Sequence, residues 1–155
     1  MIMRPLTLVA LLTFALAAVP IAAGKEAIGG PSTDPGIADG SKQRRLDRAR
    51  RDWRAAGLRS YRYMLTRTCY CPPLARTIVV HAGRPAADTP KELADEATVP
   101  RLFRRIQRAI DAKVARISVT YGRRGVPRSI YVDVDRRIAD EEIGYEIGQF
   151  TPLKR

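Results

Sequence analysis

Two cysteines, Cys69 and Cys71, have the clearest chemical potential in this chain. Thiols two positions apart could form a local disulfide, remain as two buried thiols, or serve a redox or metal-binding role. In an extended strand their Cα atoms would lie about 6.5 Å apart, near the upper limit for a disulfide, so a bend at Pro72 would have to bring them together. Two thiolates are an incomplete zinc site, and the only histidine, His81, is expected on the other face of the sheet. All three roles of the cysteines therefore stay open.

Arginine is concentrated in two segments that have helical patterning. Residues 44–54 hold six arginines against two aspartates, and residues 101–113 hold five basic residues against one aspartate. If both helices lie on the same side of a sheet, their outer faces make one basic platform, and the candidate anion-binding residues are Arg44, Arg48, Arg51, Arg104, Arg105 and Arg108. The alternative is that these arginines are only the solvated faces of two ordinary helices.

Other familiar chemistry does not fit the remaining polar residues. A calcium loop that began at Asp133 would place Arg137 and Ile138 at its fifth and sixth positions, where an oxygen ligand and a glycine are needed. The Gly122–Gly125 segment has neither the pattern of a phosphate loop nor a helix after it. The sequence therefore predicts no catalytic residues, no metal-ligand set and no cofactor.

The amino terminus predicts export. Residues 1–24 combine a cationic head, an apolar run from Leu6 to Ala18 and a small-residue exit, which is the pattern of a cleaved signal peptide. The alternative is an N-terminal membrane anchor, although the apolar run is short for a span. The expected location is secreted, periplasmic or elsewhere in the cell envelope, where an oxidising compartment favours a disulfide.

The remaining chain divides into a linker and one domain. Residues 25–43 are rich in Gly, Pro and Asp with few large apolar residues, so they are expected to form a flexible linker. Residues 44–155 are long enough for a single core. The chain has 155 residues, 45% of them apolar, and a net charge of +12, which describes one small basic domain rather than a multi-pass membrane protein.

Hydrophobic periodicity gives the order of elements in that domain. Helical stripes are expected over residues 44–56 and after Pro100, with a short helical turn near residues 90–96. Strands are expected over residues 61–71, 77–81, 117–121, 130–134 and 143–147. The predicted fold is α+β, in the order α-β-β-α-β-β-β, with two helices packed on one face of a mostly antiparallel five-stranded sheet.

Two hairpin registers follow from the apolar pattern. In the first hairpin, Cys71 is expected opposite Arg76, which places Cys69 opposite Ile78. In the second, Tyr121 is expected opposite Arg128, which places Val119 opposite Ile130 and Ile117 opposite Val132.

The chain also resembles a known family. The residues that carry the resemblance are Trp53, Ser60-Tyr61-Arg62-Tyr63, Cys69-Tyr70-Cys71-Pro72, Leu102-Phe103 with Ile106, Tyr121 with Gly125 and Pro127, and Asp140-Glu141-Glu142 with Tyr145. In this set the chain resembles a bacterial family of small exported domains, the domain-of-unknown-function family 6174, over about residues 44–150. The resemblance implies an exported α+β domain, and it implies no activity, cofactor or catalytic residue.

The leading hypothesis is an exported, non-enzymatic domain that binds an envelope partner. The partner would be an anionic polymer or lipid surface at the helices, or a protein at the exposed sheet. The alternative is a thiol-disulfide or metal-handling protein that uses Cys69 and Cys71. Nucleic acid would suit the positive charge, but the export signal and the lack of stacking aromatics among the helix arginines argue against it.

Overall fold

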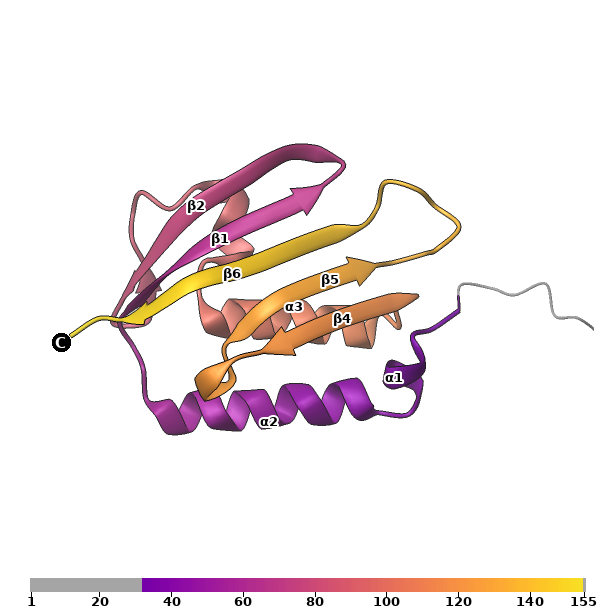
Figure 1. Ribbon diagram of the computed structural model, residues 1–155, viewed down its shortest axis with the longest axis horizontal. Helices are drawn as coiled ribbons and strands as arrows, with labels where there is room; N and C mark the ends of the chain where they lie inside the picture. Colours follow the sequence, from indigo (N-terminus) through magenta and orange to yellow (C-terminus); the bar gives the residue numbers. More distant parts are fainter. Residues whose placement is uncertain (1–31, 155) are drawn as a thin grey trace, which may run out of the picture.

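The computed structural model describes residues 32–154, which form one antiparallel sheet with helices on one face (Figure 1). The helices are α1 (Pro35–Ala38), α2 (Ser41–Ala56) and α3 (Val99–Asp111), with the 3-10 segments η1 (Lys91–Glu96) and η2 (Arg123–Gly125). The strands are β1 (Tyr61–Cys69), β2 (Cys71–His81), β3 (Arg84–Pro85), β4 (Arg116–Tyr121), β5 (Pro127–Asp133) and β6 (Ile143–Pro152). The predicted signal peptide lies outside the described residues.

The sheet has six strands in the order β3-β2-β1-β6-β5-β4, so the prediction of five strands is wrong by one. The additional strand, β3, pairs only with Val80 and His81. It forms because Ala82 and Gly83 both adopt positive φ and turn the chain back sharply. The predicted α+β class and the antiparallel pairing are otherwise confirmed.

The predicted linker extends too far, because the ordered chain already includes α1 and the first residues of α2 before Arg44. Asp34 explains this order. Its buried carboxylate accepts hydrogen bonds from the backbone N–H groups of Gly36 (2.7 Å) and Ile117 (2.9 Å), and its own N–H donates to the Val114 carbonyl (2.9 Å). A capped turn is thereby attached to the sheet, which the polar composition of this stretch did not indicate.

The register predicted for the first hairpin is wrong, whereas that of the second is confirmed except at Tyr121. Cys69 pairs with Cys71, so Arg76 lies opposite Leu65. The sequence predicts a break in strand structure at Pro72, but β2 continues through this proline. This half of β2 is an edge of the sheet that β3 does not reach, and edge strands tolerate proline. In the β4–β5 hairpin Ile117 pairs with Val132 and Val119 with Ile130, as expected, but an irregularity after Thr120 places Tyr121 opposite Pro127 and not opposite Arg128.

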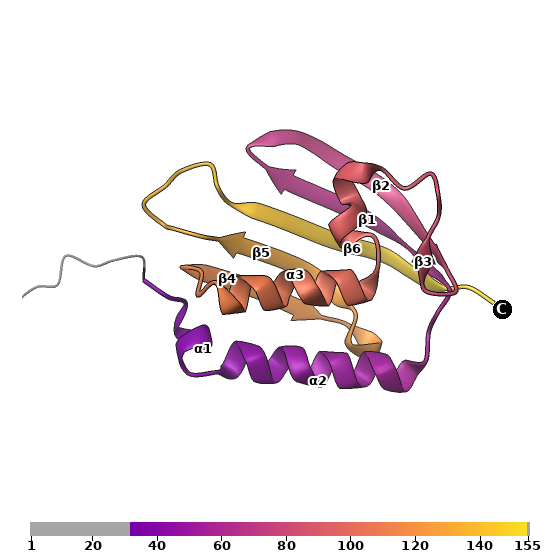
Figure 2. The same cartoon turned by 180° about the vertical axis from the view of Figure 1, so that it is seen from behind.

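The core lies between the helices and one face of the sheet. Both predicted helical stripes are buried in it, Leu46, Ala49 and Trp53 from α2 and Leu102, Phe103, Ile106, Ala109 and Ile110 from α3. Figure 2 shows α3 across this face and α2 beside α3 near β4. No described helix covers the opposite face of the sheet. The prediction that the helices share one face is therefore confirmed.

Two buried tyrosines on β1 attach the helical layer to the sheet. The Tyr63 hydroxyl donates to the Glu96 carbonyl at 2.6 Å, and the Tyr61 hydroxyl accepts from the Val99 N–H at 3.1 Å. Burial raises the pKa of Tyr61 to about 12, although the bond from Val99 acts against this shift. Both contacts lie where η1 passes into α3, so they fix the start of that helix.

We expect Tyr63→Phe to lower the free energy of unfolding by about 1–3 kcal/mol, because it leaves the Glu96 carbonyl buried without its donor. Chemical denaturation measures the change. The control is Tyr70→Phe, since Tyr70 is 81% exposed and should tolerate the same loss of a hydroxyl. Equal stability of the two variants would contradict this role for Tyr63.

Gly125 permits the closest approach between α2 and the β4–β5 turn. It has a φ of +72°, and a Cβ at this position would overlap the backbone carbonyl of Ala49. Gly83 has a φ of +82° but nothing within 4 Å of such a Cβ. Alanine substitutions at Gly125 and Gly83 therefore separate the effect of steric overlap from that of backbone strain.

We expect Gly125→Ala to destabilise the fold by more than about 2 kcal/mol, since it adds overlap with a helix backbone to the strain of positive φ. Gly83→Ala should cost only about 1 kcal/mol, from strain alone. Denaturant unfolding of both variants tests the difference. A Gly125→Ala protein as stable as Gly83→Ala would show that α2 does not pack on the turn as described.

Candidate functional site

The helices α2 and α3 meet along a polar seam. Gln43 and Gln107 exchange side-chain hydrogen bonds at 2.8 and 3.2 Å, and the Arg50 guanidinium donates to Gln107 Oε1 at 2.8 Å. Asp47 and Asp111 also bond to these glutamines, Asp47 to Gln43 at 3.0 Å and Asp111 to Gln107 at 2.9 Å. The seam therefore engages two of the three aspartates of these helices, whereas Asp52 is exposed, four residues after Arg48.

Five of the six predicted anion-binding arginines are exposed on these two adjacent helices. We call this set the basic helical face, and it consists of Arg44, Arg48 and Arg51 on α2 with Arg104 and Arg108 on α3. Among the residues that the structure describes, Arg108 forms an ion pair, with Asp95 at 3.0 Å, and the other four form none. The side chains of Arg108 and Asp95 are both more than half exposed, so this ion pair restrains Arg108 only weakly.

Arg105, the sixth candidate, is not part of this face. Its guanidinium lies 3.5 Å from the carboxylate of Glu96, which is buried, and 5.1 Å from the centre of the Tyr145 ring. The side chain thus compensates a buried charge beneath η1. The prediction that Arg105 serves the outer platform is wrong, because its position at the margin of the apolar stripe lets it turn toward η1.

A polar pocket of about 340 Å³ lies beside Arg105, and the sequence analysis missed it. Its lining includes Arg67 of β1, Tyr145 and Ile143 of β6, and residues of η1. Burial raises the pKa of the Tyr145 phenol above its ordinary value, so the group stays protonated. The sequence feature that could have indicated this pocket is Arg67, a charged residue that continues the inward alternation of Tyr61, Tyr63 and Leu65.

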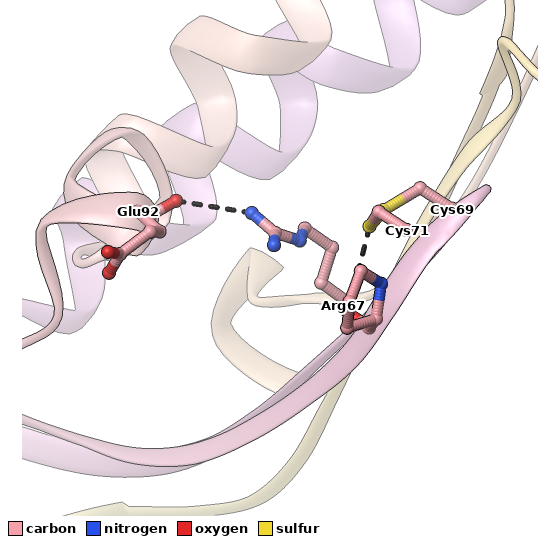
Figure 3. Close-up of a disulfide and its surroundings, with 5 residues drawn as sticks. Arg67, Cys69, Cys71 and Glu92 are labelled. Atoms are coloured by element: carbon pink, nitrogen blue, oxygen red, sulfur yellow. Dashed lines mark hydrogen bonds between the residues drawn. A yellow bond between two sulfur atoms is a disulfide. The ribbon is translucent and has the colours of Figure 1, made fainter.

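Cys69 and Cys71 are joined by a disulfide, with their Cα atoms 5.1 Å apart (Figure 3). The separation is shorter than in an extended strand because Tyr70 alone turns the chain between β1 and β2. Tyr70 is 81% exposed at this tip. The disulfide therefore closes the hairpin and presents an aromatic ring to solvent.

The structure also places the single histidine away from the cysteines. His81 ends β2, which Cys71 begins, and it pairs with Arg84. Within residues 32–154, no three His, Cys, Asp or Glu side chains are grouped so that they could hold a metal ion. None of the helices in this part of the chain is long and apolar enough to cross a membrane.

A comparison of the sequence with models of protein families identifies the family of this chain. The model of a family of unknown function, DUF6174, matches residues 45–152, which run from α2 to the end of β6. The chain belongs to this family. The residues that match DUF6174 include four of the five arginines of the basic helical face, both cysteines of the disulfide and the lining of the pocket beneath η1. No curated protein and no solved structure matches the chain.

We expect replacement of both cysteines by serine to leave the DUF6174 domain folded. The disulfide closes a loop of only three residues, so its contribution through the unfolded chain is about 1–2 kcal/mol. Denaturant unfolding of Cys69→Ser/Cys71→Ser, compared with the oxidised parent, measures this contribution. Loss of the cooperative transition would show that the bond is essential for folding.

Proposed function

We propose that this domain is an exported, non-enzymatic binding domain that holds an anionic polymer of the cell envelope through the basic helical face. The observation that carries the proposal is the exposure of five arginines on two adjacent helices, while two of the three aspartates of these helices are bonded within the seam. Several cations on one surface produce a summed potential that attracts a polyanion, even where each exposed contact is weak. Guanidinium groups also bind carboxylate, sulfate and phosphate oxygens by paired hydrogen bonds.

A polymer fits this surface better than an inserted lipid surface does. Helices that lie in a membrane interface bury an apolar face in it, whereas the apolar stripes of α2 and α3 are both in the core. The exposed large apolar residues of the described chain are Tyr70, Val134 and Ile138, and none belongs to either helix. Binding is therefore electrostatic and does not require insertion.

Export is supported by the signal-like pattern of residues 1–24 and by the disulfide, which persists in oxidising compartments. The alternative function, thiol-disulfide exchange, is favoured by the position of that disulfide at an exposed hairpin tip. The Cys69→Ser/Cys71→Ser variant separates the two functions, since polyanion binding should survive the replacement and thiol chemistry should not.

The test reverses the charge of the face. We expect a variant with Arg44, Arg48, Arg51, Arg104 and Arg108 replaced by Glu to lose heparin binding by more than about tenfold near 0.15 M salt, because it removes the contacts that release counterions. Retention on immobilised heparin, with a circular dichroism spectrum to verify folding, gives the measurement.

A matched control reverses the same number of exposed arginines on the sheet, Arg62, Arg76, Arg84, Arg116 and Arg128. Both variants have the same net charge, so the comparison isolates position. The control should remain bound at salt concentrations that release the first variant. If the two variants elute together, the helical arginines are only a solvated surface.

A further inference from the structure

We propose that the pocket beneath η1 binds a small monocarboxylate, with Arg67 as its principal ligand-binding residue. This inference is independent of the polyanion proposal, because it concerns different residues on another part of the surface. The pocket's volume of about 340 Å³ lies at the lower end of the range for small-molecule sites.

Four elements build the pocket at the point where the apolar core ends. Arg67 of β1 and Tyr145 of β6 are paired across the two strands, and Arg67 follows Tyr61, Tyr63 and Leu65 on the face that the helices cover. The segment η1 lies over this end of the sheet, and Arg105 reaches in from α3. Figure 3 shows the Arg67 side chain extending from β1 toward Glu92 of η1.

The Arg67 guanidinium has a hydrogen-bond donor without a partner among the described residues. Its Nη1 donates to the Glu92 carbonyl at 3.3 Å, and its buried Nε has no hydrogen-bond partner among the described residues. A buried, unpaired donor on a charged group is unfavourable and calls for an acceptor. The edge formed by Nε and Nη2 matches the two oxygens of a carboxylate.

The neighbouring charges favour a single negative charge on the ligand. Arg105 is already bound to Glu96, and Asp95 to Arg108, so Arg67 and Lys91 are the cations of the lining without an ion pair to the described chain. Three carboxylates, Glu92, Asp95 and Glu96, also line the pocket and would repel a doubly charged phosphate. Ile143 and Ala94 provide apolar contacts for a short hydrocarbon portion.

The experiment is an amide NMR titration of the folded, oxidised protein with N-acetyl-L-alanine. We expect saturable shifts in η1 and at the ends of β1 and β6, with a Kd of about 1 mM. The uncharged N-acetyl-L-alanine methylamide should give no saturable shifts, and inorganic phosphate should bind more weakly. No saturation with N-acetyl-L-alanine up to about 20 mM, or equal binding of the methylamide or of phosphate, overturns the proposal.

Variants of Arg67 locate the binding site. Arg67→Gln should weaken N-acetyl-L-alanine binding by at least tenfold, and Arg67→Lys, which keeps the charge but loses the paired donors, should also weaken it. The control is Arg62→Gln, an exposed arginine on the other face of the same strand. If both Arg67 variants bind as the parent does, or if Arg62→Gln weakens binding equally, Arg67 is not the anchor.

Discussion

The sheet has apolar side chains for a helical layer on one face only, and the arrangement of charge depends on this constraint. Because α2 and α3 both have to bury an apolar stripe, they pack beside each other in the same layer. The arginines opposite these stripes then point outward, whereas Arg50 lies in the seam and Arg105 turns toward η1. A pattern that is ordinary in each helix alone becomes a concentrated basic surface through tertiary packing.

The position of the pocket beneath η1 also follows from the single helical layer. After Leu65 the inward row of β1 continues with Arg67, whose side chain bonds to Glu92 of η1. A charged side chain there cannot be packed like a core residue, so the layer opens into a polar pocket. The Tyr63 hydroxyl and the Arg105–Glu96 ion pair hold its walls in place.

The parts of the fold set by local periodicity could be predicted, and those set by distant partners could not. The stripes of α2 and α3 and the β4–β5 register depend on spacing within a short segment. The β1–β2 register depends on β2 being an edge at Pro72, which requires knowledge of its neighbours. Arg105 likewise looks like the other helix arginines until Glu96, from η1, lies beside it.

The central claim is that polyanions bind to the outer surface of α2 and α3, and amide NMR of the folded protein titrated with a heparin oligosaccharide tests it most directly. We expect the largest shifts to cluster on residues 44–51 and 104–108 and to disappear as salt rises, because the contacts are electrostatic. Shifts centred on the uncovered face of the sheet or on the Cys69–Cys71 tip would show that the polyanion binds elsewhere than at the basic helical face.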